Sequence, residues 1–194
     1  MHPEFEIAIS KYSSISWLKP TLIGWAKRNI DFCNTMVPYT ETVPYYYNER
    51  ANISLLAAGA WSATPSFLAL EEYVEAKRRG SRGRAYYRGR HDLYISGKEK
   101  NSADCVLEFK QIWLRVKTME QLNSFREKNL FSKKIKAAVK DAKAADYDPK
   151  SAVGGVFCTF KMAQGGEWDK KRQEQITTLR KWVRQMKVAD TEVD

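Results

Sequence analysis

The chain has 194 residues, of which 43% are hydrophobic and 29% charged, a composition ordinary for a folded domain and too apolar for a disordered segment. Its 33 lysines and arginines exceed its 23 acidic residues, and the formal net charge of +10 indicates a polyanionic partner, with nucleic acid expected before an anionic membrane. No apolar run reaches the ~18 residues of a membrane span. Three widely spaced cysteines exclude a disulfide framework and a paired-cysteine zinc site, so we expect a cytoplasmic protein without membrane contact.

The first half of the chain is predicted to be helical. In Ile15–Cys33 the apolar residues recur at helical spacing, and Pro20 is tolerated because it lies in the first turn. Asn48 is expected to cap a second helix that runs to about Trp61. A third helix is expected over Ser66–Lys77.

After Gly80 the pattern changes to short segments rich in β-branched and aromatic residues, separated by glycines. This pattern predicts an antiparallel meander followed by a crossover helix, a buried strand and a final helix. The expected elements are the strands Arg84–Arg88, Asp92–Ser96 and Asp104–Lys110, the helix Ser132–Ala145, the strand Val156–Phe160 and the helix Asp169–Val188.

This order of elements predicts a single α/β domain with a mixed central sheet flanked by helices. Within it, residues 1–47 would form an N-terminal helical extension with a loop, residues 48–160 the core, and residues 161–194 a C-terminal helix.

The segment Asp104–Lys110 carries the strongest indication of chemistry. Because side chains alternate along a strand, Glu108 and Lys110 would share one face while Phe109 points into apolar packing on the other. The preceding strand would begin with Asp92, and the meander could place this carboxylate beside Glu108. Two carboxylates and one ammonium group would then meet at the end of a strand.

Such a group of side chains suits the hydrolysis of phosphodiesters. Paired carboxylates bind Mg²⁺, with Mn²⁺ as an alternative, and leave coordination positions open for water and substrate. In this arrangement Asp92 and Glu108 would bind the metal, and the backbone carbonyl of Phe109 would add a ligand. Lys110 would orient the attacking water or stabilise the transition state.

Asp92 together with Glu108-Phe109-Lys110 resembles the PD-(D/E)xK signature of the restriction-endonuclease-like nucleases. Gly89-Arg90-His91-Asp92 is similar to the Gly-Arg-x-Asp variant of that signature, and the order helix, three strands, helix, strand matches the family's core. The resemblance covers about residues 48–160. It implies a restriction-endonuclease-like fold in which Asp92 and Glu108 bind Mg²⁺ and Lys110 assists the attack.

Many members of this superfamily also use a glutamate on the helix before the sheet. Glu49 is the first candidate, because it shares a helical face with Ile53 and Leu56 and a buried carboxylate is costly unless it binds a partner. Glu71 is the rival on the following predicted helix. No role is assigned to His91.

Two basic segments are candidates for contact with nucleic acid. Lys77–Arg90 contains seven basic residues and no acidic one, interspersed with glycines and tyrosines that suit phosphate contact and base stacking. The second segment is the lysine-rich face of the helix Ser132–Ala145, for which a simply solvated surface is an equal alternative. The residues expected to bind nucleic acid are Arg82, Arg84, Arg88, Arg90, Gln111, Lys133 and Lys134.

The expected function is therefore Mg²⁺-dependent cleavage of nucleic acid, with DNA favoured over RNA. The alternative is a catalytically inactive protein of the same fold that binds nucleic acid, or that binds another protein as an adaptor or inhibitor. A homodimer and a complex with another protein both stay open.

Overall fold

The structure is a computed structural model that describes residues 16–35, 48–63, 67–78, 86–97, 104–116, 124, 130–144, 152–162, 174 and 176–182. In chain order the elements are the short helix η1 (Ser16–Leu18), α1 (Lys19–Thr35), α3 (Glu49–Trp61), β1 (Phe67–Arg78), β2 (Tyr86–Gly97), β3 (Asp104–Val116), α5 (Leu130–Lys143) and β4 (Ala152–Met162). Residues 176–182 are helical.

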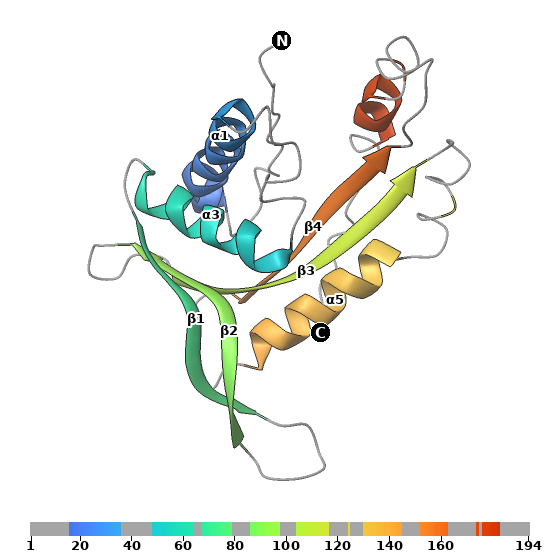
Figure 1. Cartoon of the computed structure of the whole chain (residues 1–194). Helices are drawn as coiled ribbons and strands as arrows, with labels where there is room; N and C mark the ends of the chain where they lie inside the picture. Colours follow the sequence, from blue (N-terminus) through green and yellow to red (C-terminus); the bar gives the residue numbers. More distant parts are fainter. Residues whose placement is uncertain are drawn as a thin grey trace.

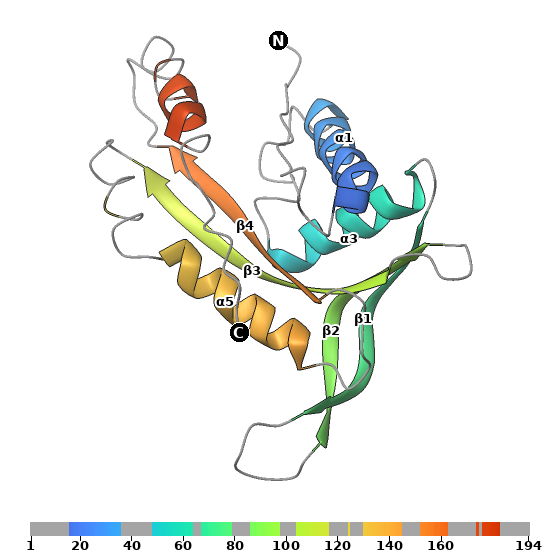
Figure 2. The same cartoon turned by 180° about the vertical axis from the view of Figure 1, so that it is seen from behind.

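The four strands form one mixed sheet in the order β1-β2-β3-β4. The pairs β1–β2 and β2–β3 are antiparallel, whereas β3 and β4 are parallel and are joined through α5. Helices α1 and α3 lie on one face of the sheet and α5 lies on the other (Figures 1 and 2). The predicted α/β class and mixed sheet are confirmed, and none of the helices in the described ranges is long and apolar enough to cross a membrane.

The sheet forks in its middle. Among the described residues, strands β2 and β3 pair from Leu93↔Leu107 to Ser96↔Asp104. Beyond that point β2 stays with β1 as far as Arg78↔Tyr86, and β3 stays with β4 as far as Val116↔Met162. Figure 1 shows the β1–β2 pair bending away from the β3–β4 pair. The backbone ladder between β2 and β3 therefore ends before Asp92 and Glu108.

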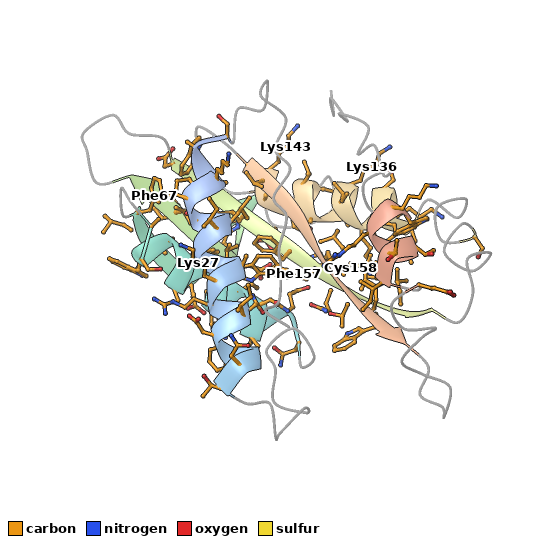
Figure 3. All side chains as sticks on the ribbon, turned by 90° about the horizontal axis from the view of Figure 1, so that it is seen from above. Lys27, Phe67, Lys136, Lys143, Phe157 and Cys158 are labelled. Carbon is orange, nitrogen blue, oxygen red and sulfur yellow. The ribbon has the colours of Figure 1, made fainter. Side chains whose placement is uncertain are left out.

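The core between the sheet and α1 is aromatic. Phe157 of β4, labelled in Figure 3, stacks on Phe109 of β3, with ring centroids 4.5 Å apart. The ring of Trp25 of α1 lies 5.8 Å from that of Phe157. Gly24 of α1 and Gly59 of α3 allow the two helices to cross at short range. A Cβ on Gly59 would lie 2.7 Å from the carbonyl oxygen of Thr21. This close crossing holds α3 over the fork.

On the opposite face, α5 approaches β4 through small residues. Ala138 and Ala142 are fully buried, and a Cβ on Gly154 would lie 2.4 Å from the backbone nitrogen of Val139. A separate hydrophobic cluster, formed by Ile112, Leu114 and Trp182, packs on the sheet farther along β3. These contacts fix α5 against the segment of β3 that carries the candidate site.

The predicted helix Ser66–Lys77 is wrong, because these residues belong to β1. Phe67 and Ala69 are buried while Leu68 and Leu70 are exposed, which is the two-residue period of a strand. The spacing of Phe67 and Leu70 also fits a helix, so the sequence pattern was ambiguous between the two structures.

The predicted separation of Arg84–Arg88 from Asp92–Ser96 is also wrong, since both fall largely within the single strand β2. Gly89 pairs with Glu75 inside the β1–β2 ladder and does not form a turn. Consequently Asp92 lies within a strand and not at its start; Arg84 itself falls outside the described residues.

The remaining elements are confirmed, with shifted ends. Asn48 caps α3 by accepting a 2.9 Å hydrogen bond from the backbone N–H of Ala51. α1, β3, α5 and β4 lie where helices and strands were expected, and β3 extends six residues beyond Lys110 to Val116. Of the predicted helix Asp169–Val188, the structure describes residue 174 and residues 176–182, which are helical.

Candidate metal and nucleic-acid site

Asp92 stands where the sheet forks and joins the two halves through its side chain. Its Oδ2 accepts a 2.7 Å hydrogen bond from the backbone N–H of Phe109. Asp92 itself is missing from both ladders: the β1–β2 register passes from Glu71↔Leu93 to Tyr73↔His91, and the β2–β3 register ends at Leu93. A carboxylate therefore takes the place of a backbone carbonyl as the partner of Phe109.

The charges of all the other predicted catalytic residues act on the carboxylate of Asp92. Its pKa is raised from 3.8 to about 6: burial is the largest cause and the charges of Glu108 and Glu49 add to it, while the Phe109 N–H and the charge of Lys110 act to lower it. An ionised Asp92 thus lies in a partly buried position near two other carboxylates.

Glu108 is almost completely buried and is held by a histidine. Its Oε1 lies 2.9 Å from Nδ1 of His91, and the two side chains are 5% and 0% exposed. Because an ionised carboxylate can only accept hydrogen bonds, Nδ1 of His91 carries the hydrogen when Glu108 is charged. The sequence analysis assigned no role to His91, although its place directly before Asp92 was visible.

Lys110 is held by an acidic side chain of α5. Its Nζ lies 3.0 Å from Oδ2 of Asp141 on α5, and the lysine side chain is 27% exposed. Burial acts to lower the pKa of Lys110, but the hydrogen bond and charge of Asp141, together with the charges of Glu108 and Asp92, raise it overall. Asp141 was not predicted, although it is the single acidic residue in a helix with five lysines.

The N-terminus of α3 supplies the fourth group. Glu49 occupies the first turn, directly after the cap Asn48, and its charge acts on the carboxylate of Asp92. The rival Glu71 lies on a strand instead of the expected helix and accepts a 2.7 Å hydrogen bond from Ser54 on the exposed flank of α3. Of the two candidates, Glu49 is the one whose charge contributes to the raised pKa of Asp92.

Gln111 belongs to a polar chain that crosses from α3 to β4. Its Nε2 donates a 2.9 Å hydrogen bond to Oγ1 of Thr159, and its Oε1 lies 3.5 Å from Nδ2 of Asn52. Asn52 is 1% exposed. This side chain therefore links α3 to the β3–β4 half of the sheet, beside the strand segment that carries Lys110.

The predicted nucleic-acid contacts are described only in part. Arg82 and Arg84 lie outside the described residues, and of Arg88 the structure describes the backbone in β2. Arg90 is exposed and forms an ion pair with Glu72, with 3.0 Å between Nη1 and Oε2. Lys133 and Lys134 are exposed on α5; Lys136 and Lys143 of the same helix lie on the side of the sheet away from α1 (Figure 3).

Carboxylates are the side-chain donors that a hard divalent cation prefers. Within the described ranges no group of three or more His, Cys, Asp or Glu side chains forms a ready-made metal cage. However, the pKa of Asp92 is raised by burial and by two neighbouring carboxylates, so a cation at this position would favour its ionised form. Carboxylates with an adjacent backbone carbonyl are the ligands that Mg²⁺ accepts while it retains bound water.

No protein-family model, curated protein or solved structure matches this chain.

Proposed function

We propose that the protein is a Mg²⁺-dependent phosphodiesterase that cleaves nucleic acid, with DNA favoured over RNA, and that its core is restriction-endonuclease-like. The single observation that carries the proposal is the 2.7 Å hydrogen bond from the backbone N–H of Phe109 to Asp92 Oδ2, which joins Asp92 to the strand segment between Glu108 and Lys110. The order α3, β1, β2, β3, α5, β4 supports it, because it is the order helix, three strands, helix, strand. The net charge of +10 supports a polyanionic substrate.

In this function Asp92 and Glu108 would bind the metal, and Glu49 and the carbonyl of Phe109 would complete its ligands. A bound Mg²⁺ supplies neutralisation of the charge that develops on the phosphate and favours ionisation of water. Lys110 holds a positive charge beside the reacting phosphate and orients the attacking water through its N–H groups. His91 fixes the orientation of Glu108, and Asp141 fixes that of Lys110.

The experiment compares the wild type with Lys110→Ala and Glu108→Gln on linear, circular and single-stranded DNA with Mg²⁺. We expect both variants to lose cleavage while they retain DNA binding. Lys27→Ala is the matched control, since this lysine is exposed on α1, and it should cleave like the wild type. Undiminished cleavage by pure Lys110→Ala would reject the assignment.

Binding without catalysis is the second candidate function, and one observation favours it. Lys110 is already engaged with Asp141, and Glu108 with His91, so both groups have protein partners in the folded chain. A protein of this kind would bind nucleic acid with salt-sensitive affinity and show no turnover with Mg²⁺ or Mn²⁺.

A further inference from the structure

Strand β1 is irregular at the position that faces Asp92. Glu72 has a φ of 49°, in the left-handed region that residues other than glycine seldom adopt. In a regular strand Glu71 and Glu72 would point to opposite faces. Here both side chains contact α3: Glu71 accepts a 2.7 Å hydrogen bond from Ser54, and Glu72 contacts Arg50 one helical turn earlier. The unusual backbone conformation therefore directs Glu72 toward α3.

Glu72 uses its two carboxylate oxygens on two different arginines. Oε1 lies 2.9 Å from Nη2 of Arg50, and Oε2 lies 3.0 Å from Nη1 of Arg90. The arginines come from α3 and β2, so the carboxylate brings together two guanidinium groups from separate elements. All three side chains are exposed, between 44% and 74%. Exposed ion pairs of this kind contribute little to stability, so we do not attribute the backbone conformation of Glu72 to them.

Both arginines border the candidate metal site along the chain. Arg50 directly follows Glu49, and Arg90 lies two residues before Asp92. A phosphodiester, like a carboxylate, presents two charged oxygens that a guanidinium group can bind, and arginine is well suited to such contacts. We propose that Arg50 and Arg90 form a binding site for a backbone phosphate of the nucleic acid, next to the phosphate at the metal site. Glu72 occupies this phosphate site in the free protein and is displaced on binding.

This inference rests on the proposed function for its ligand, the backbone of a nucleic acid, but it does not require cleavage. Its test therefore measures the binding of a short labelled DNA duplex in EDTA over a series of salt concentrations. Arg50→Gln and Arg90→Gln should each weaken binding about fivefold at low salt and reduce the salt slope by about 1. Arg28→Gln is the matched control, because Arg28 is an exposed arginine paired with Asp31 on α1 and should bind like the wild type.

The decisive variants remove the Glu72 carboxylate. Glu72→Gln removes its charge, and Glu72→Gly also suits the positive φ of 49°. Both should bind DNA about threefold more tightly than the wild type, because the phosphate no longer competes with a carboxylate. A purely structural role of Glu72 predicts weaker binding together with a lower unfolding temperature, and that result would overturn the proposal. Unchanged affinity in Arg50→Gln would also overturn it, and so would a wild type whose DNA binding does not depend on salt. If DNA binding depends on Arg50 but no cleavage is found, the proposed nuclease activity is rejected and the phosphate site stands.

Discussion

Nδ1 of His91 lies 2.9 Å from Oε1 of Glu108, and both side chains are buried, 0% and 5% exposed. Removing either partner leaves a polar or charged group in the interior without this contact, which is more costly than the pair itself is favourable. We therefore expect His91→Phe to lower the free energy of unfolding by about 3 kcal/mol. Urea unfolding followed by tryptophan fluorescence measures this change.

The double variant His91→Phe with Glu108→Leu separates pair formation from packing. If the two side chains interact directly, their combined cost is smaller than the sum of the single costs, with a coupling of at least about 1 kcal/mol. Strict additivity of the two single changes would show that the contact contributes nothing, and would remove His91 as the residue that positions Glu108.

Asp92 predicts a characteristic dependence of stability on pH. Its pKa rises from 3.8 to about 6 in the folded protein, mainly because of burial and then because of Glu108 and Glu49. The folded state thus holds this proton more tightly than the unfolded state, so the free energy of unfolding should fall as pH rises from about 4 to about 6. Asp92→Asn removes this loss and still accepts the hydrogen bond of the Phe109 N–H through its amide oxygen.

At pH 7 in EDTA we expect Asp92→Asn to be about 1 kcal/mol more stable than the wild type, a value reduced for the partial exposure of the side chain. The difference should vanish near pH 4. Addition of Mg²⁺ should raise the unfolding temperature of the wild type more than that of the variant, because binding stabilises the folded state. A variant that is less stable at pH 7, or equally stabilised by Mg²⁺, contradicts this account of Asp92.

The proposed catalytic residues were recognisable in the sequence because they depend on local rules. Alternation along β3 separates Glu108 and Lys110 from Phe109, and the cap at Asn48 places Glu49 in the first turn of α3. The antiparallel pairing of β2 with β3 then brings the side chain of Asp92 to the backbone N–H of Phe109, even though the predicted strand boundaries were wrong. The predicted proximity of Asp92 to the segment Glu108–Lys110 therefore did not depend on the exact strand boundaries.

The partners of these residues could not be predicted in the same way. His91 meets Glu108 because the sheet forks, and Lys110 meets Asp141 because small residues let α5 approach β4 closely. Both contacts depend on how two elements pack in three dimensions. The alternation of side chains within one segment does not show which side chain of another element will lie beside it.

The pairing of Lys110 with Asp141 leads to a kinetic prediction. If Asp141 positions the lysine, Asp141→Asn should lower kcat for DNA cleavage about tenfold with little change in KM, because a misplaced group acts on the transition state and not on substrate binding. The pKa of Lys110 should also fall, since the charge of Asp141 contributes to raising it. The alkaline limb of the pH–rate profile should therefore move to lower pH. An unchanged profile with normal kcat would show that the ion pair has no part in catalysis.

Gly154 connects this ion pair to the packing of the fold. A Cβ at this position would lie 2.4 Å from the backbone nitrogen of Val139 and 2.5 Å from its Cγ2, so α5 would have to move away from β4. Gly154→Ala should lower the free energy of unfolding by about 3 kcal/mol, whereas Lys136→Ala on the exposed side of α5 should change it little. Because Asp141 lies on the displaced helix and Lys110 on β3, the variant should also lose the kcat that depends on this pair. Chemical denaturation and cleavage rates measured on the same preparations test both effects. A Gly154→Ala protein with wild-type stability would show that α5 does not press on β4 as closely as the structure indicates.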